Sequence, residues 1–174
     1  KLMEKPIGEM VVYQFEDDTL VLHNDLYQIN MAESYWNDGI HERMAVFDLY
    51  FRNMPFDSGY AVFNGLKRVI DYVNSFQFSE SDIDYLKSIG YQQDFLSYLK
   101  KLKFTGNIRS MQEGELCFGN EPLLRVEAPL IQAQLIETML LNIVNFHTLI
   151  TTKASRIRQV AHEDMLMEFG TRRA

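Results

Sequence analysis

The chain has 174 residues, of which 47% are hydrophobic and 24% are charged, and its formal net charge is −7. This size and composition are typical of roughly one globular domain with a hydrophobic core. The single cysteine excludes a disulfide framework and a multi-cysteine zinc site, and the acidic balance disfavours nucleic acid as the main partner.

The N-terminal part is predicted to contain a short extended segment and a helix. Residues 11–15 alternate between side-chain types, which predicts the extended segment. Residues 26–37 carry apolar side chains at helical spacing. Asn24 or Asp25 is the predicted N-cap, because a short side-chain oxygen can accept from the free amides of the first turn. Gly39 is expected to close this helix.

The clearest predicted strand is Met44–Arg52, where apolar and polar residues alternate strictly. Its predicted inner face carries Ala45, Phe47, Leu49 and Phe51. An amphipathic helix is predicted over Tyr60–Phe76. A short capped helix follows from the Ser79 and Asp82 pair, which has capping-box spacing, and residues 92–103 form another predicted helix.

The second half is predicted to add two strands, 106–112 and 123–127, and one long helix from Leu130 to about His162. Pro129 suits the first turn of that helix. A run of more than 30 helical residues is long, and we expect a break near 148–155, where β-branched and hydroxyl residues cluster. The resulting fold class is α+β, with an antiparallel sheet and several helices.

Common catalytic motifs are absent from the sequence: there is no phosphate-binding loop, GxGxxG, HExxH or GxSxG. The scattered histidines His23, His41, His147 and His162 predict no metal site. Cys117 is interpreted as a small buried hydrophobe. Five basic residues are interpreted as surface groups, with tertiary ion pairs possible for the last two: Lys100, Lys101, Lys103, Arg156 and Arg158.

Two short stretches indicate function more strongly. Residues 24–28 place Tyr27 in the first turn of a helix beside the Asp25 carboxylate, although a capping Asp with a packed Tyr would give the same pattern. Residues 165–173 suggest a strand that delivers a carboxylate, an aromatic ring and two guanidinium groups into a loop. Arginine suits bidentate binding of phosphate or carboxylate.

At these residues the chain resembles the N-terminal part of the nicotinate phosphoribosyltransferase family. The similar blocks occur in order and are spread over nearly the whole length of the chain: Asp25–Met31, Phe47–Arg52, Gly59–Leu66 and Glu168–Ala174. The resemblance implies a type II phosphoribosyltransferase, in which an N-terminal α+β domain packs on an α/β barrel. Residues 1–163 would be that domain, and 164–174 the first strand and loop of a barrel that lies outside the chain.

The family resemblance also implies the reaction, the co-substrates and the assembly. Nicotinate and phosphoribosyl pyrophosphate would give nicotinate mononucleotide and pyrophosphate for NAD salvage, as the pyridine nitrogen attacks the anomeric carbon. ATP would be hydrolysed through a phosphorylated histidine, which makes the enzyme a ligase as well as a pentosyltransferase. Mg²⁺ would accompany phosphoribosyl pyrophosphate, and two subunits would form a homodimer with shared active sites.

Residue roles follow from the same resemblance. Tyr27 matches a tyrosine that reaches in from the neighbouring subunit and stacks on the pyridine ring, and Phe169 matches the aromatic on the opposite face. Arg172 matches an arginine that contacts substrate phosphates, and Arg173 is expected to share that role. Asp25 would be the helix cap that positions Tyr27. The phosphorylated histidine is expected beyond residue 174, so this chain holds neither a catalytic residue nor a metal ligand.

Two alternatives to this interpretation remain open. The chain could be a stand-alone binding or regulatory module derived from the same domain, or part of a relative that prefers nicotinamide. The 174-residue chain by itself is expected to be inactive. The single cysteine, the absence of a targeting segment and the lack of about 20 consecutive apolar residues favour a cytoplasmic protein with no membrane or nucleic-acid partner.

Overall fold

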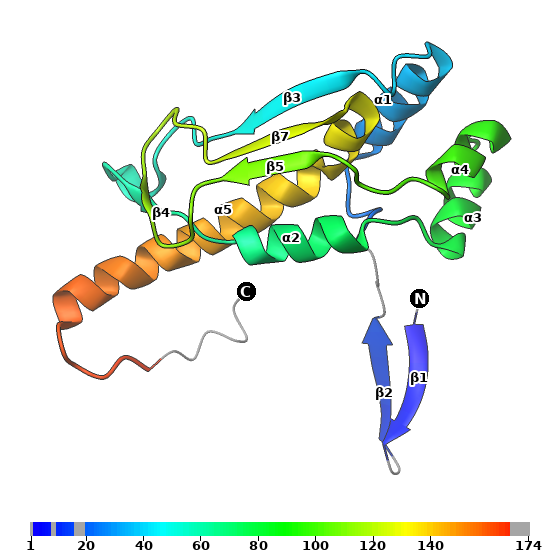
Figure 1. The fold of residues 1–174 in the computed structure, drawn as a ribbon. Coiled ribbons are helices and arrows are strands. Elements are labelled where there is room, and N and C mark those ends of the chain that lie inside the picture. The colour runs from blue at the N-terminus through cyan, green and yellow to red at the C-terminus, as the bar shows by residue number, and fades with distance from the viewer. Residues whose placement is uncertain (1, 8–9, 16–19, 168–174) are drawn as a thin grey trace.

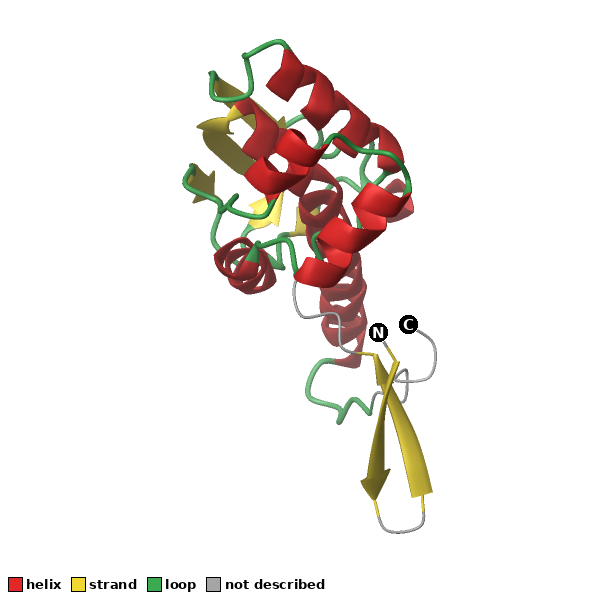
Figure 2. Ribbon diagram, turned by 90° about the vertical axis from the view of Figure 1, so that its right-hand side faces the viewer, coloured by secondary structure: helices red, strands yellow, loops and turns green. Residues whose placement is uncertain are grey.

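A computed structural model describes residues 2–7, 10–15 and 20–167. In this structure a three-stranded antiparallel sheet lies against one long helix, α5, and two of the shorter helices, α1 and α2, pack on the same helix (Figure 1). The helices are α1 (Leu26–Asn37), α2 (Leu66–Ser75), α3 (Glu80–Ser88), α4 (Gln93–Leu99) and α5 (Leu130–Ala161). In Figure 2 most of the helices lie to the right of the strands of the main sheet, and the two long strands of the N-terminal pair lie below them. The predicted α+β class is therefore confirmed.

The main sheet has the strand order β3-β7-β5, with both pairs antiparallel. Its strands are β3 (Met44–Leu49), β5 (Asn107–Ser110) and β7 (Leu124–Pro129). Burial alternates along β3 and β7, so one face carries Phe47 and Val126 toward the core while Asp48 and Arg125 lie on the other. This confirms the predicted strand and its inner face, although β3 ends three residues earlier than expected.

Two smaller strand pairs complete the described strands. The strands β1 (Leu2–Ile7) and β2 (Met10–Phe15) form an antiparallel hairpin, of which only the second strand was expected. The two-residue strands β4 (Ala61–Val62) and β6 (Leu116–Cys117) pair with each other. The prediction of helix over 60–65 is wrong, because β4 occupies its start and Gly65 adopts φ +107°. Helix α2 can begin only after that left-handed residue.

The turn between β4 and α2 is bound to α5 through threonine hydroxyls. The Val62 amide donates to Oγ1 of Thr152 at 2.9 Å, and the Asn64 amide donates to Oγ1 of Thr148 at 3.2 Å. Both threonines are fully buried. The same hydroxyl of Thr148 donates to the carbonyl oxygen of Asn64. These bonds satisfy backbone groups that face a helix and have no strand partner there.

Helix α5 runs without interruption from Leu130 to Ala161, so the break predicted at 148–155 is wrong. Isolated Thr and Ser side chains weaken helices because they compete for backbone groups. Here the Thr152 hydroxyl does donate to the Thr148 carbonyl oxygen of α5, at 2.6 Å. Both threonine hydroxyls also accept amides of the β4–α2 segment, and these tertiary contacts outweigh propensity. At the other end, Pro129 is the N-cap residue and also ends β7.

The helices α3 and α4 form a small unit at one end of the molecule (Figure 1). The Ser79 hydroxyl accepts from the Asp82 amide at 3.2 Å, and the Asp82 carboxylate accepts from the Ser79 amide at 2.7 Å. This is the predicted capping box. Helix α4 is shorter than predicted and ends at Leu99, where Lys100 takes the C-cap position.

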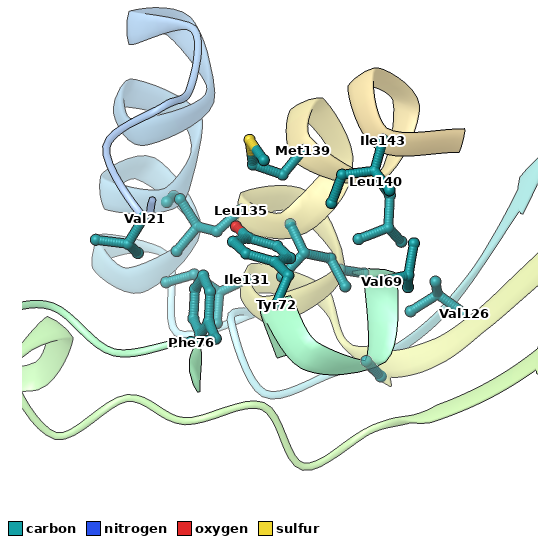
Figure 3. Packing of buried hydrophobic residues seen from close by; sticks show 14 of the residues in the cluster. Val21, Val69, Tyr72, Phe76, Val126, Ile131, Leu135, Met139, Leu140 and Ile143 are labelled. Carbon is teal, nitrogen blue, oxygen red and sulfur yellow. The ribbon is translucent and has the colours of Figure 1, made fainter. Parts of the chain in front are cut away.

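The hydrophobic core surrounds the first half of α5. Figure 3 shows Val21, Val69, Tyr72 and Phe76 packed around this helix, with Val126 from the sheet at its side. The helix contributes Ile131, Leu135, Ile136, Met139, Leu140, Ile143 and Val144, all at most 8% exposed. The helices α1 and α2 and the strands β3, β4 and β7 therefore pack on α5, and α1 carries the candidate site.

The C-terminal end of the described region is irregular. Residues 165–167, expected to start a strand, have no regular secondary structure. The remainder of that predicted strand lies outside the described residues, so the proposed division at residues 163 and 164 stays a prediction. Across residues 2–7, 10–15 and 20–167, no helix is long and apolar enough to cross a membrane.

Candidate functional site

The candidate site is the exposed surface of the first two turns of α1. Tyr27 lies in the first turn with 54% of its surface exposed, beside Leu26 at 58% and Met31 at 37%. Large apolar side chains at this exposure leave an aromatic ring available to a ligand or a partner. The interpretation of Tyr27 as a packed core residue is therefore wrong.

Asp25 occupies the N-cap position of α1, but its side chain makes no capping hydrogen bond. Instead, Oδ1 of Asn24 accepts from the Asp25 amide at 3.0 Å, while Nδ2 of Asn24 donates to the Leu135 carbonyl oxygen at 2.7 Å. The amide of Asn24 thus joins the start of α1 to α5. The prediction that Asp25 positions Tyr27 as a side-chain cap is wrong, and its carboxylate is exposed.

Gln28 follows Tyr27 and is only 1% exposed, although its side chain is polar. Its Nε2 donates to the Tyr27 hydroxyl oxygen at 3.0 Å and to Oε2 of Glu137 at 3.3 Å. Its Oε1 is buried and has no hydrogen-bond partner. A buried amide that joins an exposed ring to a carboxylate on α5 was not predicted, because Gln28 and Glu137 lie 109 positions apart in the chain.

A cavity of about 270 Å³ lies between the sheet and α5, and Glu137 is part of its wall. The wall is mainly apolar, and Asp48 of β3 also borders it. Nε and Nη2 of Arg125 donate to the two oxygens of Asp48 at 2.7 and 2.8 Å. This bidentate bond holds the pKa of Asp48 below its ordinary value. Asp48 is thus already paired, whereas Glu137 faces the amide of Gln28.

The histidines and the cysteine do not form a reactive centre in the described region. In residues 20–167, no group of three or more His, Cys, Asp and Glu side chains could hold a metal ion. His147 uses Nδ1 on the Ile143 carbonyl oxygen at 2.8 Å. Cys117 is fully buried, its thiol donates to the Ala61 carbonyl, and burial raises its pKa. The interpretation of Cys117 as a small buried hydrophobe is confirmed.

The basic residues singled out from the sequence have structural contacts. Lys100, Lys101 and Lys103 are exposed, as predicted, and Lys100 pairs with Glu80. Within the described residues 20–167, Arg156 forms no ion pair, and its guanidinium lies over the rings of Phe56 and Tyr60, at 5.2 and 5.6 Å from their centroids.

Arg158 is exposed, which confirms its interpretation as a surface group. Its Nη1 donates to the carbonyl oxygens of His162 and Asp164, at 2.7 and 2.9 Å. It therefore binds the carbonyl groups that follow the C-terminus of α5, a favourable place for a cation.

The other site residues expected from the sequence are Phe169, Arg172 and Arg173, and they lie outside the described residues. The structure places Tyr27 on α1 and the Glu137 that supports it on α5, and the substrate-binding roles of all four residues stay predictions.

Two solved structures share the arrangement of these elements. The structure of human nicotinic acid phosphoribosyltransferase superposes with a TM-score of 0.79 at 36% sequence identity, over 87% of this chain and 31% of that one. Nicotinate-nucleotide pyrophosphorylase from Pyrococcus furiosus superposes with a TM-score of 0.64 at 17% identity, over 89% of this chain and 32% of that one, which shows a shared fold only. The fold is thus that of an N-terminal α+β domain of the phosphoribosyltransferase type.

Sequence comparison identifies the family. Residues 22–145 match the family described as nicotinate phosphoribosyltransferase (NAPRTase) N-terminal domain, and the chain belongs to this family. It is 60% identical to nicotinate phosphoribosyltransferase of Bacillus subtilis over 95% of this chain and 34% of that protein. The Dictyostelium discoideum enzyme is 46% identical over 88% of this chain and 27% of its own length. The chain thus spans about a third of the length of these relatives.

Proposed function

We propose that this chain is the N-terminal part of an enzyme that joins nicotinate to phosphoribosyl pyrophosphate, releasing nicotinate mononucleotide and pyrophosphate in NAD salvage. The 60% identity to the Bacillus subtilis nicotinate phosphoribosyltransferase over nearly the whole chain is the observation that carries the proposal. The location expected for this enzyme is the cytoplasm. The 174-residue chain should have no turnover by itself, and an assay of the chain beside the intact enzyme tests this.

Within this proposal, Tyr27 stacks on one face of the pyridine ring and Phe169 on the other. The exposure of Tyr27 supports its role, since a ring that is 54% exposed is available to a flat ligand. An aromatic pair contributes about 0.5–1.5 kcal/mol beyond the burial of its area. The protein then orients the pyridine nitrogen for attack on the anomeric carbon, which lowers the entropic part of the barrier.

Arg172 and Arg173 are proposed to bind the substrate phosphates. A guanidinium donates two parallel hydrogen bonds to phosphate oxygens and stabilises the negative charge that grows on the departing pyrophosphate. Mg²⁺ would enter with phosphoribosyl pyrophosphate. Residues 20–167 offer no cluster of three or more His, Cys, Asp or Glu side chains for it, so we assign no step of this chain to the ion. Coupling to ATP would use a histidine beyond residue 174.

The proposed active enzyme is a homodimer in which Tyr27 enters the site of the partner subunit. Leu26 and Met31 support this arrangement, because they flank Tyr27 with exposed apolar surface that a second subunit would cover. Shared sites would explain why a nicotinate-binding ring lies on the outside of its own domain.

Substitution of Tyr27 tests the proposed function directly. In the intact enzyme, Tyr27→Ala should raise the KM for nicotinate at least several-fold and leave the enzyme folded, with cooperative thermal unfolding. Tyr85→Ala is a matched control, because Tyr85 is 56% exposed on α3 and should not affect kinetics. A KM for nicotinate that is the same in Tyr27→Ala and the parent enzyme would contradict the stacking role.

A second test concerns the phosphate contacts. Arg172→Ala should raise the KM for phosphoribosyl pyrophosphate more than the KM for nicotinate, because the lost guanidinium contacts phosphate. Equal effects on both substrates would refute this assignment.

Steady-state rates with nicotinate and nicotinamide on the same enzyme should show a preference for nicotinate, and a preference for nicotinamide would favour the alternative family member.

A further inference from the structure

We infer that Gln28 and Glu137 are positioning residues for Tyr27, which they hold with its hydroxyl proton free to donate to an anionic oxygen of a bound reactant. The inference rests on the proposed function of Tyr27 and adds a hydrogen bond to its stacking role. The acceptor oxygen belongs either to the nicotinate carboxylate or to a phosphate of phosphoribosyl pyrophosphate, since both are anionic oxygens of the same reaction.

The first step is the orientation of the Gln28 amide. One end of this amide faces two oxygens, the Tyr27 hydroxyl at 3.0 Å and Oε2 of Glu137 at 3.3 Å. An ionised carboxylate can only accept hydrogen bonds, so the end that faces Glu137 must be the NH₂ group. The opposite orientation would set the carbonyl oxygen of Gln28 against the carboxylate oxygens and leave both N–H groups buried without partners.

The second step concerns the Tyr27 hydroxyl. Its oxygen accepts one N–H of Gln28, and the other N–H goes to Glu137. A phenol has one proton, and that proton cannot point at an N–H donor. Within residues 20–167 the Tyr27 hydroxyl donates to no acceptor, and the residue is half exposed. The proton is therefore directed away from Gln28, where it can reach an acceptor that binds over the surface of α1.

The third step is the rigidity of the support. Glu137 follows Leu135 and Ile136, which are 1% and 0% exposed, so its backbone is fixed in the core. The Leu135 carbonyl oxygen also accepts from Asn24, which fixes the start of α1 against the same turn of α5. A ring attached to this turn gains a defined orientation, which reduces the entropy lost when a ligand stacks on it.

The unpaired Oε1 of Gln28 supports a positioning role. A buried carbonyl oxygen without a partner costs about 1–3 kcal/mol, and a leucine at this position would avoid that cost. The structure instead keeps an amide that is 1% exposed and satisfies only its nitrogen. A leucine could not form the hydrogen bonds to Tyr27 and Glu137, so these two bonds are the contribution that distinguishes the amide.

The experiment is a double-mutant cycle in the intact enzyme with Tyr27→Phe, Glu137→Ala and both changes together. Tyr27→Phe keeps the ring and removes the hydroxyl. Each single change should raise one KM about three- to tenfold, the loss of one hydrogen bond, with kcat unchanged. The double variant should be no worse than Tyr27→Phe alone, because Glu137 acts through that hydroxyl. A rise for nicotinate identifies the carboxylate as the acceptor, and a rise for phosphoribosyl pyrophosphate identifies a phosphate.

Further variants separate positioning from folding. Glu137→Gln should restore the KM toward the parent value, because its amide oxygen can still accept from Gln28. Gln159→Leu is the matched control: Gln159 donates to the Tyr60 hydroxyl at 3.1 Å in a similar Gln–Tyr pair far from Tyr27, and its loss should leave both KM values unchanged. If Glu137→Ala does not fold, Tyr27→Phe alone still decides whether the hydroxyl contributes.

Two results would overturn the inference. One is a Tyr27→Phe enzyme with both KM values unchanged, and the other is additive effects of Tyr27→Phe and Glu137→Ala. The Tyr27→Ala variant separates these failures from failure of the proposed function. If Tyr27→Ala raises the KM for nicotinate and Tyr27→Phe raises neither KM, the stacking role is supported and the hydroxyl role is refuted. If neither variant raises the KM for nicotinate, the stacking role itself is refuted.

Discussion

Helix α5 holds two distant regions of the chain by different kinds of bond. The start of α1 is held through the side-chain amides of Asn24 and Gln28, which reach the Leu135 carbonyl and the Glu137 carboxylate. The β4–α2 turn is held through its own backbone, whose amides donate to the buried hydroxyls of Thr148 and Thr152. The first half of α5 thus binds the start of α1, and its second half binds the β4–α2 turn.

The difference predicts separate consequences for stability and function. A backbone amide of the turn that loses its threonine partner is left buried and unsatisfied, which destabilises the fold. Removal of the Asn24 or Gln28 amide leaves few buried groups without a hydrogen-bond partner. It does, however, weaken the attachment of the α1 surface that carries Tyr27. Changes at the turn should therefore lower stability, and changes at α1 should mainly alter substrate binding. The predictions below test this separation.

The largest expected effect is that of Gly65→Ala in the β4–α2 turn. Gly65 has φ +107°, and an added Cβ would lie 3.2 Å from both the Cβ of His147 and the carbonyl oxygen of Ile143. Backbone strain and crowding together should lower the free energy of unfolding by about 2–4 kcal/mol, measured by urea denaturation. Gly39→Ala is the matched control, since Gly39 has φ +68° but nothing within 4 Å. Equal losses for both would show that contact with α5 does not matter.

The next effect concerns the hydroxyl of Thr152. Thr152→Val keeps the shape of the side chain but removes the acceptor of the Val62 amide, which should cost about 1–3 kcal/mol of unfolding free energy. Thr152→Ser keeps the hydroxyl and loses a methyl group, so it separates the hydrogen bond from packing. A Val variant as stable as the parent, measured by the same denaturation, would refute the importance of this bond.

A smaller effect on stability is expected at the start of α1. Asn24→Ala removes the bond to the Leu135 carbonyl, which still lies within the helical turns of α5, and should cost about 0.5–1.5 kcal/mol. The same variant should raise the KM for nicotinate in the intact enzyme, because α1 loses an attachment. Asn24→Asp keeps the acceptor for the Asp25 amide and removes only the donor. A large stability loss with an unchanged KM would reverse the distinction between the two regions.

The smallest effect is expected for Asp48→Asn, because Asp48 is exposed and its side chain is bonded to Arg125 on the outer face of the sheet. The bond to Arg125 lowers the pKa of Asp48 below its ordinary value of 3.8, so the pair stabilises the folded state above that pH. This contribution is lost as the pH falls through the lowered pKa. Urea midpoints of the parent and the variant should therefore differ slightly near pH 7 and converge near pH 2. A difference that grows at low pH would contradict this sign.

Local chemistry made several elements predictable from the sequence. The capping box of α3 follows from Ser79 and Asp82 alone, because all of its bonds lie within four residues. The alternation of β3 revealed its inner face, since neighbouring side chains on a strand point to opposite sides. Tyr27 is predicted to be a site residue through the family resemblance alone, and the structure adds that its ring is exposed.

Long-range contacts account for what could not be predicted. The continuous course of α5 depends on bonds from Thr148 and Thr152 to a turn more than 80 positions earlier. From the sequence, Gln28 looks like an ordinary polar residue of a helix. Its hydrogen bond to Glu137 exists only once α1 packs on α5. The strand β4 has two residues and is held by β6 and by a threonine, so its own sequence carries almost no strand signal.

The burial of Cys117 has a practical consequence for chemical labelling. It is the single cysteine of this chain, it is fully buried, and its raised pKa disfavours the thiolate that alkylating reagents require. A cysteine introduced at Leu26, which is 58% exposed, would thus be the reactive thiol of the described region. A fluorescent dye attached there would lie beside Tyr27, and its emission would report in real time when the surface of α1 becomes covered.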